Sequence, residues 1–212
     1  MAKVKDSKKK LGTARANDAV RGARAATSAS RILRIIGGRH RGRRLRFPAG
    51  VEIRPTPDRV RETLFNWLQP RIVGARVLDL FAGSGALGLE ALSRGAAAVT
   101  FVEKDRRAAA AIEALAQEWQ ESGANVICAD ALTWLGTSPQ AGPFDIVLLD
   151  PPYDLPLLAP AAAALAAARM LAADARVYVE GRAREPLPGL PESWRAIRDG
   201  RAGEVGYHLF AS

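Results

Sequence analysis

One segment constrains the fold of this chain more than any other: an apolar strand that ends in a carboxylate and runs directly into a glycine-rich turn. Residues 77–90 read Val-Leu-Asp-Leu-Phe-Ala-Gly-Ser-Gly-Ala-Leu-Gly-Leu-Glu. Gly83, Gly85 and Gly88 match the G-x-G-x-x-G spacing that opens a helix in nucleotide-binding α/β sheets. Such glycines allow a tight turn and a close approach between backbone and ligand. The segment therefore predicts a strand, a turn and a helix, with a ligand site at the turn.

The rest of the chain repeats this alternation of apolar strands and helices, which is typical of a parallel sheet covered on both faces. Strands are predicted at residues 75–80, 98–103, 125–128, 144–149 and 175–180, and helices at 86–94, 105–122, 131–136 and 157–172. Two further strands, near 194–198 and 204–210, have a short connection and predict an antiparallel hairpin. The expected fold is α/β and Rossmann-like, with a seven-stranded, mostly parallel sheet and an antiparallel terminal hairpin.

A basic extension precedes this sheet. Residues 1–46 hold 15 Lys and Arg against 2 Asp and Glu, whereas the remaining residues carry a net charge of −4. Residues 1–30 have little to bury and are expected to form a disordered tail. Residues 31–47 predict a basic hairpin that turns at Gly37-Gly38, packs its apolar residues and exposes its arginines. The charge predicts contact with a polyanion, and a solvated tail or an organelle transit peptide are the alternatives.

The hairpin and a loop form an extension over residues 31–55, and residues 56–212 form the main domain. A helix capped by Thr56 is predicted to open this domain and to end at Pro70. The single cysteine, Cys128, excludes an internal disulfide and is expected to be a buried, reduced thiol. No apolar run of 18 residues and no secretory signal occur, so we expect no membrane span and a cytoplasmic protein.

Three carboxylates stand at the ends of neighbouring predicted strands, where open α/β sheets bind ligands: Asp79, Glu103 and Asp130. Glu103 suits a ribose hydroxyl and Asp130 suits an adenine amino group. Asp79 distinguishes between two candidate cofactors, because its carboxylate would repel a dinucleotide pyrophosphate and attract the ammonium group of S-adenosylmethionine. We therefore predict a pocket for S-adenosylmethionine, with helix capping as the alternative role of each carboxylate. Neighbouring residues assigned to this pocket are Phe81, Gly83, Gly85, Lys104 and Ala131.

A second motif ends another apolar strand. Residues 144–153 read Phe-Asp-Ile-Val-Leu-Leu-Asp-Pro-Pro-Tyr. The Asp150 carboxylate and the Pro151 carbonyl can accept the N–H groups of an exocyclic amine and direct its lone pair toward a methyl donor, while Tyr153 stacks on an unpaired or extruded base. This motif predicts methyl transfer to a nucleobase amine without a metal. The same motif serves adenine N6 and cytosine N4 chemistry, and Asp150 is compatible with guanine N2, so the motif alone does not choose the base or separate RNA from DNA.

The two motifs together resemble the class I amino-methyltransferases. Residues 34–42 (Arg-Ile-Ile-Gly-Gly-Arg-His-Arg-Gly) and 54–67 (Arg-Pro-Thr-Pro-Asp-Arg-Val-Arg-Glu-Thr-Leu-Phe-Asn-Trp) are similar to one family among them, the bacterial small-subunit ribosomal RNA guanine-N2 methyltransferases. The similarity covers residues 32 to about 210. It implies S-adenosylmethionine as the methyl donor and a guanine of 16S ribosomal RNA, within small-subunit particles, as the target. It also implies that Arg54, Thr56, Glu62 and Asn66 lie near the cofactor.

We assign RNA contact to the hairpin arginines and to the aromatic residue of the second motif, and we expect a monomer. The assigned residues are Arg39, Arg41, Arg43, Arg44 and Tyr153. Two other classes of function stay open. A nicotinamide oxidoreductase would bind NADH, which Asp79 disfavours. A non-catalytic RNA-binding module would retain RNA without methyl transfer, which the intact motifs disfavour.

Overall fold

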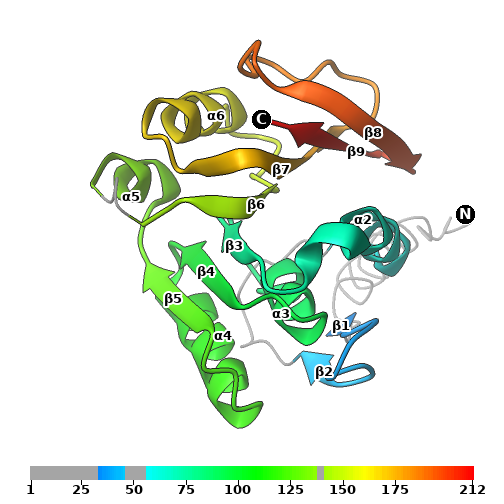
Figure 1. Cartoon of the computed structure of the whole chain (residues 1–212), viewed down its shortest axis with the longest axis vertical. Coiled ribbons are helices and arrows are strands. Elements are labelled where there is room, and N and C mark those ends of the chain that lie inside the picture. Colours follow the sequence, from blue (N-terminus) through cyan, green and yellow to red (C-terminus); the bar gives the residue numbers. More distant parts are fainter. Residues whose placement is uncertain (1–32, 46–55, 138–140) are drawn as a thin grey trace, which may run out of the picture. The chain divides into compact units, whose positions relative to one another are not determined.

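A seven-stranded sheet forms the centre of the computed structural model, which describes residues 33–45, 56–137 and 141–212 (Figure 1). The strand order is β5-β4-β3-β6-β7-β9-β8. The strands are β3 (Arg76–Asp79), β4 (Ala98–Glu103), β5 (Ala124–Cys128), β6 (Phe144–Leu149), β7 (Leu171–Arg182), β8 (Arg195–Ala202) and β9 (Val205–Ala211). Neighbours from β5 to β7 pair in parallel, whereas β9 pairs antiparallel with both β7 and β8. The predicted mostly parallel sheet with an antiparallel terminal hairpin is confirmed.

Helices cover both faces of this sheet, as its apolar strands predict. They are α2 (Asp58–Ile72), α3 (Ala86–Ser93), α4 (Arg106–Glu118), α5 (Ala131–Thr137) and α6 (Leu158–Ala167). Successive residues of a strand point to opposite faces. In β6, Ile146 and Leu148 therefore join a core with α2, α3 and α4, while Val147 and Leu149 join a second core with α5 and α6.

The basic hairpin is present, although its strands are short. β1 (Leu33–Arg34) pairs antiparallel with β2 (Arg44–Leu45), and Leu33, Ile35 and Leu45 are buried in the core that contains α2 and α3. The predicted turn at Gly37-Gly38 is wrong. The chain turns over residues 38–43, where the Arg41 N–H donates to the Gly38 carbonyl and the Arg43 N–H to the His40 carbonyl. Gly38 instead packs on α3: it adopts a φ of +76°, and a Cβ there would lie 1.9 Å from the Ser93 carbonyl oxygen.

Several predicted helix ends are wrong because tertiary contacts override local signals. Pro70 lies inside α2, which continues to the buried Ile72. Helix α4 ends at Glu118, before Gln120 turns to a φ of +58°. Helix α6 ends at Ala167 because Leu171 already pairs with Phe144 of β6.

Cys128 corrects a further expectation, since its side chain is exposed. It lies at the end of β5, which is an edge strand of the sheet, and β5 buries its residues only in part. The predicted disordered tail and the loop before Thr56, including Arg54, lie outside the described residues.

Candidate active site

The glycine-rich turn lies between β3 and α3, as predicted. Gly85 precedes the helix with a φ of +69°, and a Cβ at this position would lie 2.8 Å from Cγ1 of Ile112. At Gly88, inside α3, a Cβ would lie 2.2 Å from the Phe101 ring on β4. The sequence motif therefore meets two needs at once: a left-handed turn and a close approach between helix and sheet.

Asp79 is a buried carboxylate at the end of β3. Its side chain is almost fully enclosed, and Oδ2 accepts the Gly88 N–H at 2.9 Å. Burial raises the pKa of the Asp79 carboxyl from 3.8 to about 7; the Gly88 N–H opposes this shift and the Glu103 charge adds to it. A carboxyl group with this pKa exchanges its proton near neutral pH, so a bound cation can shift it to the ionised form.

Glu103 joins two turns at the edge of the site. Its Oε2 accepts the Gly83 N–H and its Oε1 accepts the Asp105 N–H, both at 2.7 Å. These bonds hold the carboxylate in one orientation beside the glycine-rich turn. A carboxylate oxygen can accept more than one hydrogen bond, so this geometry is compatible with the predicted ribose contact.

Asp130 acts as a helix cap, which is the alternative role that its sequence position allows. Its Oδ1 accepts both the N–H and the hydroxyl of Thr133 at 3.0 Å, and these bonds keep the pKa of Asp130 below its usual range. Asp130 therefore caps the start of α5. Lys104 is exposed and its charge lowers the same pKa further, whereas Ala131 is buried in the core under α5. The predicted adenine contact stays a prediction.

The second motif follows β6 directly, and β6 lies beside β3. Asp79 and Asp150 therefore end neighbouring strands at the point where the strand order reverses, which is where open α/β sheets bind ligands. The Thr56 hydroxyl donates to Oδ2 of Asp150 at 3.3 Å. Thr56 thus contacts the second motif and does not cap α2, whose first turn has no side-chain cap.

The remaining predicted residues take different places. Pro151 is buried, and Phe81 and Tyr153 are half-buried. Glu62 and Asn66 lie on the exposed side of α2, opposite the core residues Val60 and Leu64, so their place near a cofactor stays a prediction.

Comparisons with known proteins agree with the fold and the motifs. Residues 33–211 match the family described as "Conserved hypothetical protein 95". The chain is 44% identical over 183 residues to "Ribosomal RNA small subunit methyltransferase D" of Escherichia coli, covering 86% of this chain and 91% of that protein. The chain belongs to this methyltransferase D family. The protein of the same name from Haemophilus influenzae is 43% identical over 181 residues, covering 84% of this chain and 93% of the relative.

A solved structure supports the same assignment. The protein yhhF of Escherichia coli, described as a candidate methyltransferase, superposes with a TM-score of 0.76 at 44% identity and covers 85% of this chain and 97% of its own. The predicted class I methyltransferase fold and the family resemblance are both confirmed. Within the described residues no helix is long and apolar enough to cross a membrane, and no group of three His, Cys, Asp or Glu is arranged to hold a metal ion. Metal-free chemistry, the monomeric state and the cytoplasmic location stay predictions.

The hairpin of this methyltransferase D relative exposes all four arginines assigned to RNA, but two of them also contact the protein. Arg39 donates from Nε to Oε1 of Glu121 at 2.8 Å, and the Arg43 guanidinium lies 5.5 Å from the centroid of the Trp119 ring. Arg41 and Arg44 are exposed. The surface charge of the hairpin is thus carried on a segment that is held against the turn that follows α4.

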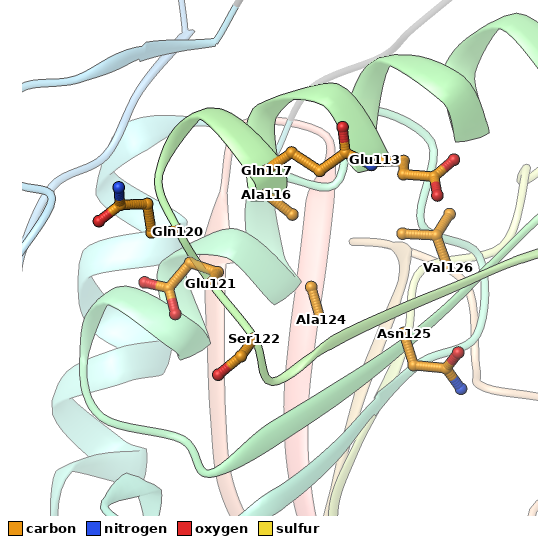
Figure 2. Close-up of a pocket in the computed structure, with 9 residues that line it drawn as sticks. All are labelled: Glu113, Ala116, Gln117, Gln120, Glu121, Ser122, Ala124, Asn125 and Val126. Atoms are coloured by element: carbon orange, nitrogen blue, oxygen red, sulfur yellow. The ribbon is translucent and has the colours of Figure 1, made fainter.

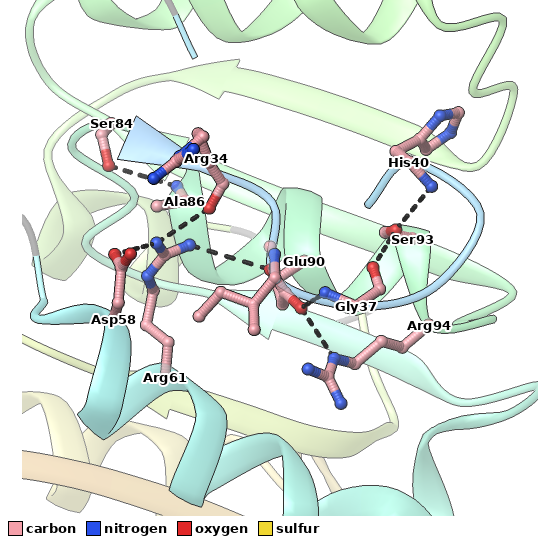
Figure 3. Close-up of polar contacts among 12 residues, drawn as sticks. Arg34, Gly37, His40, Asp58, Arg61, Ser84, Ala86, Glu90, Ser93 and Arg94 are labelled. Carbon is pink, nitrogen blue, oxygen red and sulfur yellow. Dashed lines mark hydrogen bonds and ion pairs between the residues drawn. The ribbon is translucent and has the colours of Figure 1, made fainter. Parts of the chain in front are cut away.

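Sequence reasoning missed a buried ion cluster that holds the hairpin to the helices (Figure 3). Glu90 of α3 is fully buried, and its carboxylate accepts the Ile36 and Gly37 N–H groups, each at 2.8 Å. The same carboxylate accepts Nε of Arg94 at 2.7 Å and lies 3.7 Å from the fully buried Arg61 guanidinium of α2. The available signal was a lone glutamate within the apolar run of residues 86–92.

A hollow of about 420 Å³ lies elsewhere, between α4 and the edge strand β5 (Figure 2). Its lining includes Glu113, Gln117 and Asn125, and it extends toward Ala124 at the start of β5. Ligand sites of open α/β sheets lie at the carboxyl ends of the strands. We therefore do not assign the active site to this hollow.

Proposed function

We propose that this chain transfers a methyl group from S-adenosylmethionine to N2 of a guanine in 16S ribosomal RNA, within a small-subunit particle. One observation carries the proposal: the buried carboxylate of Asp79 and the Asp-Pro-Pro-Tyr motif that begins at Asp150 end adjacent strands. The relatives' names supply the RNA and the subunit, and the motifs supply the chemistry.

The acidic groups of the site fit the proposed methyl donor. S-adenosylmethionine supplies an electrophilic methyl group on a sulfonium cation, and it carries an ammonium group but no phosphate. Asp79, with its readily exchanged proton, would bind the ammonium group, and Glu103 would accept a ribose hydroxyl. Phe81 and the glycine-rich turn would line the pocket. A pyrophosphate would meet the Asp79 carboxylate here, which argues against a nicotinamide dinucleotide.

The second motif would act on the target amine. The N2 nitrogen donates its two N–H groups to the Asp150 carboxylate and the Pro151 carbonyl, which directs its lone pair away from the purine ring. That nitrogen then forms a bond to the methyl carbon as the carbon–sulfur bond breaks, and Asp150 accepts the proton that the nitrogen loses. Tyr153 stacks on the extruded base and holds it in line with the methyl group.

The exposed arginines of the hairpin would bind the RNA backbone. Arg39, Arg41, Arg43 and Arg44 are exposed on one short segment, and residues 1–30 add further positive charge. Each phosphate that they neutralise releases counterions, so affinity should fall steeply with salt. These contacts position the RNA, while the motif at Asp150 selects the base.

A methylation assay on defined particles tests the proposal. Small-subunit particles from a strain that lacks this activity are incubated with the purified chain and S-adenosylmethionine, and their nucleosides are mapped by mass spectrometry. We expect one N2-methylguanosine in 16S RNA, together with calorimetric binding of S-adenosylmethionine and S-adenosylhomocysteine. Methylation of adenine N6 or cytosine N4 would show that the choice of base is wrong. If the chain bound neither S-adenosylmethionine nor S-adenosylhomocysteine, the proposal would be overturned.

The raised pKa of Asp79 predicts that S-adenosylmethionine binds more tightly as the pH rises. With a pKa of about 7, the Asp79 carboxyl is mostly protonated near pH 6 and mostly ionised near pH 7.5, and only the ionised form attracts the ammonium group. The dissociation constant should fall roughly fivefold to tenfold over this interval. Calorimetry in buffers of different ionisation enthalpy should also detect proton release on binding.

Asp79→Asn is the control, because its amide does not titrate and its affinity should not follow the pH. The stability of the free protein depends on pH in the opposite direction. The folded state holds the Asp79 proton more tightly than the unfolded state, so this residue's contribution to stability falls as the pH rises from about 4 to about 7. A dissociation constant in the native protein that does not change with pH would contradict the assigned role of Asp79.

A further inference from the structure

A second buried carboxylate lies at the same edge of the sheet as Asp150. Glu180 of β7 is only 2% exposed. In the parallel pairing of β6 with β7, Leu149 lies opposite Val179, so Asp150 and Glu180 follow at the same level of the sheet. Burying a carboxylate carries a large desolvation penalty unless hydrogen bonds satisfy it. Its partners therefore indicate what this residue does.

The two oxygens of Glu180 accept hydrogen bonds from two tyrosines. The Tyr178 hydroxyl donates to Oε1 at 2.7 Å, and the Tyr153 hydroxyl donates to Oε2 at 3.2 Å. Tyr178 stands two residues earlier on β7, hence on the same face of the sheet, and is fully buried. Burial raises the pKa of Tyr178 well above its ordinary value, and the Glu180 charge adds to this, so its hydroxyl remains a donor at neutral pH. Tyr178 thus fixes the orientation of the Glu180 carboxylate.

Tyr153 needs such a fixed partner. It follows two prolines in a segment without helix or strand, and its ring is half-buried. The next residue, Asp154, is paired with Arg182 of β7 at 2.7 Å, but both of these side chains are exposed and such a pair contributes little. The phenol bond to Glu180 reaches into the protein interior, and it can orient the ring.

We propose that Glu180 is a positioning residue that holds the Tyr153 ring in the orientation required for stacking on the target base. The proposal rests on the function proposed above. An aromatic ring that is held before the substrate arrives loses less conformational freedom on binding, and it keeps the amine in line with the methyl group. The effect should therefore appear in turnover more than in the affinity for RNA, which the arginines dominate.

The test compares Tyr153→Phe, Glu180→Ala and the double variant in steady-state methylation of small-subunit particles. Each single variant should lower kcat about tenfold, with KM for the particle and the dissociation constant of S-adenosylhomocysteine changed less than about twofold. The double variant should be no slower than Glu180→Ala, because both changes remove the same hydrogen bond. Glu180→Gln should recover most of the lost activity, since its amide oxygen can accept the phenol. A wild-type kcat for Tyr153→Phe, or two effects that multiply, would overturn the inference.

Two further variants separate positioning from a structural role. Tyr178→Phe removes the other hydrogen bond of Glu180, and its main effect should be a lower Tm. Glu204→Gln removes a carboxylate from the exposed turn between β8 and β9, and should change neither kcat nor Tm. If Glu180 served stability alone, Glu180→Ala would lower Tm with no loss of kcat per folded molecule. If the wild-type protein transferred no methyl group to the particles, the proposed function itself would be refuted. Tyr153→Phe still tests the inference if Glu180→Ala does not fold, because Tyr153→Phe leaves the buried carboxylate in place.

Discussion

Replacing Asp150 by alanine is expected to lower kcat by roughly 10²–10⁴-fold while the affinity for S-adenosylmethionine changes less than about twofold. In the proposed reaction its carboxylate contacts the target amine and accepts its proton, whereas the two carboxylates assigned to the cofactor, Asp79 and Glu103, lie on strands β3 and β4. Single-turnover kinetics with small-subunit particles would give the rate, and calorimetry the affinity.

The companion variants make this experiment specific. Asp150→Asn keeps one acceptor oxygen but is a poor base, so its loss of rate should be intermediate. Thr56→Val removes the hydroxyl that donates to Asp150 at 3.3 Å, and should reduce kcat by a smaller factor. If Asp150→Ala weakened cofactor binding as much as turnover, Asp150 would belong to the cofactor pocket.

Glu90→Ala should destabilise the protein by about 3–5 kcal/mol, because the buried Arg61 guanidinium loses its buried carboxylate partner and keeps only Asp58, whose side chain is exposed. The Ile36 and Gly37 N–H groups would lose their acceptor as well. For a protein of this size the change corresponds to a Tm lower by about 10 °C. Urea unfolding followed by circular dichroism, together with a thermal scan, would measure both quantities.

The matched control is Glu113→Ala, the same change at an exposed position of α4, which should shift Tm by less than about 2 °C. The double variant Arg61→Leu/Glu90→Leu removes both buried charges and should be less destabilised than the sum of the single variants. A small effect of Glu90→Ala would mean that water or a neighbouring group compensates for the lost carboxylate. The hairpin would then be attached chiefly through Leu33, Ile35 and Leu45.

Local patterns were enough to predict the elements around the site. The apolar runs at β3 and β6 have the length and composition of buried strands, and the glycines after Asp79 have few other uses than a tight turn into a helix. Wrong helix ends arose where the competing contact is distant in sequence. Residues 171–172 read as helix by composition, yet Leu171 pairs with Phe144 of β6.

The sequence by itself determined which residues are assigned to the chemistry: the strand-end carboxylates, the glycine-rich turn and the Asp-Pro-Pro-Tyr motif are all visible as short, contiguous patterns. Only the tertiary structure decided which distant groups support them. It places Thr56 on Asp150, holds Tyr153 against Glu180, and joins Glu90 to Arg61 and the hairpin. The partners in these three pairs are 94, 27 and 29 residues apart in the sequence. The pairs at Asp150 and Tyr153 meet because β3, β6 and β7 are neighbours in the sheet, and Glu90 meets Arg61 because α2 packs beside α3. The periodicity of a strand or helix reveals which of its faces is buried, but the strand order and the packing of the layers decide what lies against that face.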